Sequence, residues 1–382
     1  MNPSLPKIQV SDSQIQQAEQ AVSRAQMIAP PTGFEELAKQ WSQTSALGLD
    51  TEFVRERTFY PRPGLIQVSD GQAIWLLDPV GRDAFPCFGD ILDNRNIIKI
   101  LHSVGEDLEV FRILTGSLPD PLFDTQIAAA MLGMPLQFRY EKLVEHCFSV
   151  ELPGGQARSD WCRRPLSEGL LRYAAQDVIW LGRLQQLLTE TLEQEGRLAW
   201  HEEDCARLIR QARADDAGNP VLRVKGAGRL DDGQLAWLAR LADWREQQAR
   251  GRDLPRSFVI RDEAMIDLAE RGGKGQELEQ ALNRLAPPLL RRYGDTLRGL
   301  LTGSAPDALE RPSELVALDS EQREAVKQAQ AAVRQLAEEL DVDPALIASK
   351  RELTRLVRGE TPDWMQGWRG QFLGDLFSKL KG

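Results

Sequence analysis

Four carboxylates and one tyrosine, spread over three separate segments, are the residues of this chain whose types and spacing best suit chemistry. Asp50 and Glu52 lie in LGLDTEF, Asp107 in LHSVGEDLEVF, and Tyr173 and Asp177 in RYAAQDV. Carboxylate oxygens are the ligands that hard cations such as Mg²⁺ prefer. Two such cations, about 4 Å apart, stabilise both the attacking and the leaving oxygen when a phosphodiester is hydrolysed. The set therefore predicts a two-metal phosphodiesterase site.

Local patterns predict the elements that position the first three carboxylates. ALGLDTEF is typical of a strand, and side chains two apart on a strand share a face, so Asp50 and Glu52 are expected to point the same way with Thr51 opposite. The short apolar run IIKILH at 97–102 predicts a second, buried strand. It leads into a helix whose first turn contains Asp107, where the helix dipole favours a carboxylate.

The third segment predicts a long helix, LSEGLLRYAAQDVIWLGRLQQLL. Ser167 is a good N-cap for it, and Tyr173 and Asp177, at positions i and i+4, share one face. Four carboxylates gathered without a cation would repel one another, and some of them would take up protons. A bound pair of cations removes that cost, so the carboxylates and the metals are predicted together.

Each segment also has an ordinary structural interpretation. A D-x-E at a strand end is common, Asp107 is a favourable charge at a helix start, and Tyr173 and Asp177 fit one face of an amphipathic helix. The order of the segments favours the catalytic interpretation: strand D-x-E, then strand-to-helix Asp, then helical Y-x-x-x-D. On motifs alone it stays a hypothesis.

In this order the motifs resemble those of the DEDD superfamily of 3′→5′ exonucleases, in the branch whose third motif is Y-x-x-x-D, and within it the bacterial ribonuclease D family. The resemblance is strong over residues 47–188 and includes LDTEFVRERTFYPRPGLIQVSDG, LHSVGEDLEVF, FDTQIAAAMLG, RSDWCRRPLSE and YAAQDV. The C-terminal third is similar in kind to the helical HRDC modules of that family, with a weaker signal. One loop departs from the family pattern: ELPGGQARSDW has Gly154, Gly155 and Gln156 where a lysine and an acidic residue are expected, so a basic substrate contact from this loop is in doubt.

The resemblance implies a role for each of the five residues. Asp50, Glu52 and Asp177 would bind the first metal; Asp50 would bridge to the second, which Asp107 would hold through water. Tyr173 would orient the attacking water and help to deprotonate it. Because a free tyrosine has a pKa near 10 and is a poor base at neutral pH, positioning is the favoured role. Glu52 and the adjacent backbone would also lie near the 3′-terminal ribose. The implied ions are two Mg²⁺ or Mn²⁺.

The implied activity is hydrolysis of the terminal phosphodiester of RNA, with release of nucleoside 5′-monophosphates from the 3′ end. Transfer RNA precursors with a 3′ tail are the implied substrate. A DNA exonuclease of the proofreading type is an alternative, because this chemistry does not involve the 2′-OH. A noncatalytic RNA-binding scaffold is a second alternative, against which the intact five-residue set argues.

The fold that the resemblance implies is α/β: a ribonuclease H-like mixed sheet with flanking helices, followed by two small all-helical HRDC-like domains. The expected boundaries are an exonuclease domain at 1–214 with a polar N-terminal extension at 1–33, a linker at 215–230, and helical domains at 231–303 and 304–382. Within the first domain, LIQVSDGQAIWLLD predicts a hairpin around Asp70-Gly71 and residues 12–27 a polar helix. DVDPALIASKRELTRLV echoes RDLPRSFVIRDEAMIDLA, which is a weak internal repeat.

Composition fits an ordinary globular protein with more than one domain. The chain has 382 residues, 42% hydrophobic and 27% charged. No apolar run approaches the roughly 18 residues of a membrane span, and the N-terminus lacks a signal-peptide core. The four cysteines form no C-x-x-C pair and the three histidines are scattered, so neither zinc nor disulfides are expected. These features predict a reduced, cytoplasmic protein without membrane contact, and a monomer is expected.

The net charge of −10 is unusual for a protein that binds a polyanion, and the acidic excess falls within residues 1–222, where two divalent cations would offset part of it. Such a chain is not expected to bind RNA strongly and nonspecifically, but it suits an enzyme that engages only a 3′ end. Basic side chains form three local clusters, each either a solvated face or an RNA contact: Arg55, Arg57 and Arg62; Arg158, Arg163 and Arg164; and Arg245, Arg250, Arg252 and Arg256.

Aromatic side chains near these clusters are candidates for stacking on single-stranded bases. They are Phe53, Phe59, Tyr60 and Trp161. Neighbouring arginines favour surface contact for Tyr60 and Trp161, whereas Phe53 is expected in the core.

Overall fold

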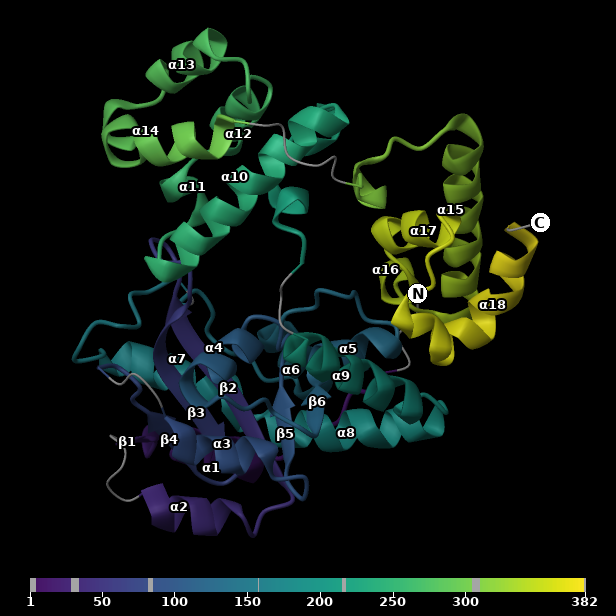
Figure 1. Ribbon diagram of the computed structural model, residues 1–382. Helices are drawn as coiled ribbons and strands as arrows, with labels where there is room; N and C mark the ends of the chain where they lie inside the picture. The colour runs from purple at the N-terminus through teal and green to yellow at the C-terminus, as the bar shows by residue number, and fades with distance from the viewer. Residues whose placement is uncertain are drawn as a thin grey trace. The chain divides into compact units, whose positions relative to one another are not determined.

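The computed structural model describes residues 5–28, 34–81, 85–156, 158–214, 218–303 and 310–380 (Figure 1). The chain divides into two compact units. The first comprises Met1–Val54, Pro61–Asp215 and Glu324–Gly382, and the second comprises Arg55–Tyr60 and Asp216–Arg323. No helix in the described residues is both long enough and apolar enough to cross a lipid bilayer.

The first unit is built on a mixed sheet of six strands in its described part, in the order β1-β4-β3-β2-β5-β6. The β2–β3 and β3–β4 pairs are antiparallel, and the β1–β4, β2–β5 and β5–β6 pairs are parallel. The strands are β1 (Gln26–Ile28), β2 (Ala46–Val54), β3 (Arg62–Ser69), β4 (Ile74–Leu77), β5 (Ile98–Leu101) and β6 (Leu122–Asp124). Both predicted strands, β2 and β5, are therefore present and paired with each other.

The predicted hairpin joins β3 to β4. The carboxylate of Asp70 accepts hydrogen bonds from the backbone N–H groups of Gln72 (2.9 Å) and Ala73 (2.8 Å). Gly71 has a φ of 85°, a conformation that costs glycine nothing. The N-terminal helix was predicted to run to Met27, and this is wrong: α1 (Asp12–Ser23) ends earlier, and β1 pairs with β4 instead. β1 thereby occupies backbone groups of β4 that an edge strand would leave unpaired.

Alternate side chains of the strands enter two hydrophobic cores on opposite faces of the sheet. Leu65 and Leu76 belong to one core and their sequence neighbours Ile66 and Leu77 to the other. The first core includes residues of α1, α5 (Thr125–Met131), α6 (Tyr140–Phe148), α7 (Glu168–Ile179) and α8 (Leu181–Gln194). The second includes residues of α2 (Phe34–Trp41), α3 (Pro86–Asp93), α4 (Asp107–Thr115) and α9 (Leu198–Arg213).

The long helix predicted from Ser167 is present as two helices, α7 and α8, which meet at Trp180. Ser167 caps α7 as predicted, because its hydroxyl oxygen accepts a hydrogen bond from the backbone N–H of Leu170. The Trp180 ring is buried and lies 5.5 Å from Phe148, centroid to centroid. The break lies C-terminal to the site residues, so Tyr173 and Asp177 stay on one continuous helix.

The second unit is helical and packs around the apolar stripe of α10 (Asp232–Gly251). Its described elements are η1 (Pro220–Arg223), η2 (Ala227–Arg229), α10, α11 (Arg256–Val259), α12 (Asp262–Ala269), α13 (Gln276–Asn283), α14 (Pro287–Leu301) and η3 (Ser313–Leu315). This stripe is buried in full: Leu235, Leu238, Leu241, Ala242 and Trp244. In the expected linker, Val221, Val224 and Ala227 are buried in this same core.

The C-terminal helices repeat the start of the second unit, as the weak sequence repeat predicted. They are α15 (Ser320–Leu340), α16 (Pro344–Ile347), α17 (Lys350–Val357), η4 (Asp363–Gln366) and α18 (Trp368–Leu380). Helices α10, α11 and α12 start at 232, 256 and 262, and α15, α16 and α17 start at 320, 344 and 350, a constant offset of 88 residues. Asp253 and Asp341 keep the same offset, and both have a φ of 50°.

Candidate active site

Asp50 and Glu52 extend from β2, which lies inside the sheet between β3 and β5. Asp50 pairs in register with Gln67 of β3, whose side-chain amide donates to the Asp50 carboxylate at 3.4 Å. A bulge follows immediately, between Glu52 and Phe53. Bulges of this kind re-aim side chains beside functional sites. The D-x-E pair is thus held on a rigid central strand at the point where its pairing changes.

Asp177 of α7 brings a third carboxylate to this pair. Single carboxylate oxygens of Asp50, Glu52 and Asp177 all lie within 4.8 Å of one another, and no other group of three potential metal ligands forms within the described residues. Tyr173, one turn earlier, donates its phenol hydrogen to Asp177. The predicted shared faces of the strand pair and of the helical pair are both present.

Asp107 lies in the first turn of α4, as predicted, and is buried. Its carboxylate accepts a hydrogen bond from the hydroxyl of Thr51. It is not part of the three-carboxylate group, but it lies near enough to Asp50 to raise the pKa of that carboxyl. Asp107 therefore approaches Asp50 from the side of α4, while Asp177 approaches from the side of α7.

Sequence reasoning missed Asp124, a buried residue at the end of β6. Its carboxylate accepts from the backbone N–H groups of Ser103 (3.2 Å) and Val104 (2.9 Å), which lead into α4 and Asp107. The same carboxylate caps α5 through the N–H groups of Gln126 and Ile127. The available signal was the Asp-Thr pair before an alanine-rich helix, which is a typical N-cap pattern.

Burial raises the pKa of every carboxyl in the site, and repulsion from nearby carboxylates adds to the shift. The pKa of Asp50 lies well above its usual value, and that of Glu52 rises to about 9, in both cases mainly because of burial. Burial raises the pKa of Asp107 and of Asp177 to about 7, although hydrogen bonds from Thr51 and Tyr173 oppose the two shifts. Four carboxyl groups with raised pKa values lack the positive charge that would stabilise their ionised forms.

A divalent cation fits this cluster. All donors are carboxylate oxygens, which suit Mg²⁺ or Mn²⁺ better than softer metals. Asp50 and Asp177 keep part of their surface exposed, so solvent and ligand reach the group, whereas Glu52 is buried. The arrangement therefore indicates a divalent-metal site on the central strand of an α/β sheet.

Comparisons with known proteins identify the family. A family model described as 3′-5′ exonuclease matches residues 25–193, and one described as HRDC domain matches residues 234–301. A ribonuclease D of Shewanella sp. (strain ANA-3) is 39% identical over 377 residues, 96% of each chain. The chain belongs to the ribonuclease D family. The ribonuclease D of Pseudomonas paraeruginosa is 39% identical and covers 91% of this chain and 95% of its own.

A solved ribonuclease D has the same fold. The Escherichia coli crystal structure, described as an exoribonuclease involved in structured RNA processing, has a TM-score of 0.84 and 33% identity over 94% of this chain and 98% of that chain. The predicted mixed sheet with flanking helices and a helical HRDC region is confirmed, as is the resemblance to the 3′→5′ exonucleases.

Trp161 is not the surface residue that its arginine neighbours predicted. In this ribonuclease D family member its side chain is 0% exposed and its ring lies 6.1 Å from that of Tyr173. Arg164 explains the difference, because it pairs with Asp78 (2.6 Å) and donates to the backbone carbonyls of Gly64 and Trp161. The guanidinium group of Arg164 thus holds this loop in place, with the Trp161 ring buried.

The third basic cluster is mainly structural. Arg245 is buried and pairs with Asp262 at 2.5 Å, and both Arg250 and Arg256 bind the carboxylate of Glu246. Glu246 therefore neutralises arginine side chains that the sequence analysis considered as RNA contacts. Burial opposes the shift, but these arginines lower the pKa of Glu246.

The other aromatic side chains that were candidates for base stacking also differ in how far they are buried. Phe59 is buried beneath two guanidinium groups, those of Arg250 at 5.1 Å and Arg256 at 4.7 Å from the ring centroid. Phe53 is partly buried against the core that contains α4, as expected. Tyr60 is partly exposed and stays a candidate for base stacking.

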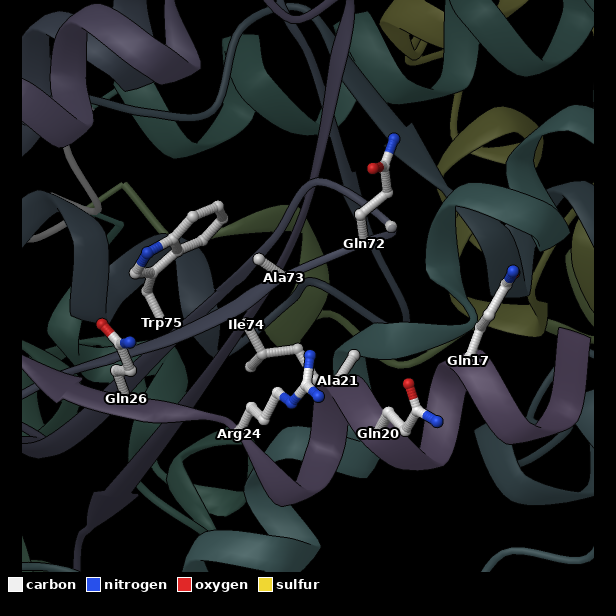
Figure 2. Close-up of a pocket in the computed structure, with 10 residues that line it drawn as sticks. Gln17, Gln20, Ala21, Arg24, Gln26, Gln72, Ala73, Ile74 and Trp75 are labelled. Atoms are coloured by element: carbon white, nitrogen blue, oxygen red, sulfur yellow. The ribbon is translucent and has the colours of Figure 1, made fainter.

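A separate groove of about 590 Å³ lies between α1 and the turn that joins β3 to β4 (Figure 2). Its polar lining side chains are the amides of Gln17, Gln20, Gln26 and Gln72 together with Arg24. None of its described lining residues is a carboxylate, so the groove does not belong to the acidic cluster.

Proposed function

We propose that this exoribonuclease uses two divalent cations to trim the 3′ tails of structured RNA, with transfer RNA precursors as the substrate class. Membership of the ribonuclease D family makes the chain a 3′→5′ exoribonuclease. The observation that carries the metal proposal is the convergence of Asp50, Glu52 and Asp177 to within 4.8 Å on an exonuclease fold. The nearness of Asp107 to Asp50 supports the second cation. The description of the Escherichia coli relative supports structured RNA as the substrate.

In this proposal Asp50, Glu52 and Asp177 would hold the first cation, and Asp50 and Asp107 would hold the second. When bound, such cations acidify a water and offset the negative charge that develops on the phosphate during in-line displacement. Tyr173 acts as a hydrogen-bond donor. Burial and the three nearby carboxylates raise its pKa, so the phenol keeps its proton at neutral pH and orients groups instead of removing a proton.

One chain supplies all five residues, and we propose that the enzyme works as a monomer. The helical domains would hold the body of the RNA while its 3′ end enters the acidic site. The domain boundaries at 214, 230 and 303 belong to this proposal, and the 88-residue offset between α10–α12 and α15–α17 supports a second HRDC-like domain after the one matched at 234–301.

The deciding experiment follows shortening of a 3′-tailed, end-labelled transfer RNA beside a matched DNA oligomer. Each is incubated with Mg²⁺, with Mn²⁺ and with EDTA, and Asp50→Asn is the control. The proposal expects RNA to shorten from its 3′ end with release of nucleoside 5′-monophosphates, and expects EDTA and the substitution to abolish this. Preferential trimming of DNA would support a proofreading-type exonuclease. RNA binding without hydrolysis would support a noncatalytic scaffold.

A further inference from the structure

Thr51 stands between the two carboxylates of the D-x-E pair, yet it faces the other side of the sheet. Leu47, Leu49 and Phe53, at alternate positions of β2, pack in or against the core that contains α4. Thr51 shares their side of the strand, and its side chain is buried and donates to Asp107 at the start of α4. The strand thus presents carboxylates to α7 and a hydroxyl to α4.

Both carboxylates proposed for the second cation are hydrogen-bonded to this one residue. The backbone N–H of Thr51 donates to the carboxylate of Asp50, and its hydroxyl donates to Asp107. One residue therefore contacts both carboxylates, through its backbone on Asp50 and through its side chain on Asp107.

The hydroxyl also fixes the direction of the Asp107 side chain. A threonine hydroxyl has one hydrogen to donate, and here the recipient is a single oxygen, Oδ1. The backbone N–H of Asp107 itself also donates to this carboxylate. On the other side, Asp124 holds the backbone that leads into α4, through Ser103 and Val104. The backbone and the side chain of Asp107 are thus restrained by different neighbours.

From this geometry we infer that Thr51 is the positioning residue of the second metal site: its hydroxyl orients Asp107 for the cation that Asp107 and Asp50 share. The inference rests on the proposed two-metal function. Substitution of a group that orients a ligand typically weakens metal affinity about 10- to 100-fold, and the same loss is expected when the Thr51 hydroxyl is removed.

The test compares Thr51→Val, which keeps the shape but removes the donor, with Thr51→Ser, which keeps the donor. Mn²⁺ is titrated calorimetrically into the metal-free full-length chain in the presence of adenosine 5′-monophosphate. We expect Thr51→Val to weaken the lower-affinity Mn²⁺ site about tenfold or more and to leave the higher-affinity site nearly unchanged. Thr51→Ser should restore the wild-type titration. The Mg²⁺ concentration for half-maximal RNA hydrolysis should shift in parallel.

Three outcomes would overturn the inference. A Thr51→Val titration identical to wild type would exclude a role for the hydroxyl, and so would a Thr51→Ser variant as impaired as Thr51→Val. A wild-type chain that binds one Mn²⁺ or none, or that fails to hydrolyse RNA, would overturn the proposed function itself. Melting curves in EDTA check that the variants fold, and Thr51→Ala repeats the comparison with a smaller side chain if valine lowers the folded fraction.

Discussion

Arg369 of α18 and Asp204 of α9 form a buried, two-pronged ion pair within the first unit. The two N–O distances are 2.5 Å and 2.7 Å, and the side chains are 5% and 1% exposed. Arg369 also donates to the backbone carbonyls of Leu346 and Ile347 of α16. Beside it, the ring of Trp368 stacks on that of Trp200 at 4.8 Å. These contacts attach the C-terminal helices to α9.

The first prediction follows from this pair. Asp204→Ala leaves a buried guanidinium without its counter-charge, which typically costs about 3–5 kcal/mol. Urea unfolding followed by tryptophan fluorescence measures the loss. Arg213→Ala is the matched control on α9, because its pair with Asp120 is half-exposed and is worth less than about 1 kcal/mol. Equal losses in the two variants would show that burial does not make the Asp204 pair special.

The second prediction concerns pH and metal. The folded pKa of Asp107 and Asp177 is about 7 and that of Glu52 about 9, above the unfolded values near 4. A raised acid pKa stabilises the fold at pH values below the unfolded pKa, and this stabilisation is lost as pH rises through the folded pKa. The melting temperature in EDTA should therefore fall between about pH 5 and pH 9.

Metal should reverse this loss, and the gain from Mg²⁺ or Mn²⁺ should grow with pH. Asp50→Asn is the control, because it removes one of the repelling charges. In EDTA the variant should be more stable than wild type at pH 8, by a margin that shrinks at pH 5.5. If the margin between the two proteins stayed constant across this range, the carboxylates would not be the cause.

The five candidate residues were predictable because each obeys a local rule. Alternation along a strand placed Asp50 with Glu52, helical spacing placed Tyr173 with Asp177, and a strand followed by a helix placed Asp107 in a first turn. Each rule needs only neighbours within a few positions. The elements that carry the residues were predictable for the same reason.

Contacts between distant segments were not predictable in this way. The sequence placed Thr51 opposite Asp50, but its partner Asp107 is 56 positions away, and only the packing of α4 on the sheet brings them together. Similarly, the nearby Arg164 suggested that Trp161 lies at the surface. In the fold Arg164 pairs instead with Asp78, 86 positions earlier, which the sequence did not indicate. A sequence shows that a basic side chain is present but not which carboxylate pairs with it.

The third prediction concerns Tyr173. Tyr173→Phe keeps the ring beside Trp161 but removes the hydrogen bond to Asp177. If the phenol positions groups, kcat should fall roughly a hundredfold with little change in KM. The alkaline limb of the pH–rate profile should keep its position, because the pKa of Tyr173 is raised and the phenol does not titrate in the working range. Loss of that limb in the variant would instead make Tyr173 a general base.

Lys99 provides the last prediction. It lies in β5 inside the apolar run that predicted the strand, is 0% exposed, and donates its three hydrogens to the backbone carbonyls of Asn94, Ile97 and Asp120 at 2.7–2.8 Å. Lys99→Met fits the apolar surroundings but leaves these carbonyls without their donor, so we expect a loss of about 3 kcal/mol in urea unfolding. Lys142→Met, on an exposed helix face, should change stability by less than about 0.5 kcal/mol. A Lys99→Met protein as stable as wild type would show that the carbonyls find other donors, and that the buried lysine does not hold the turns flanking β5.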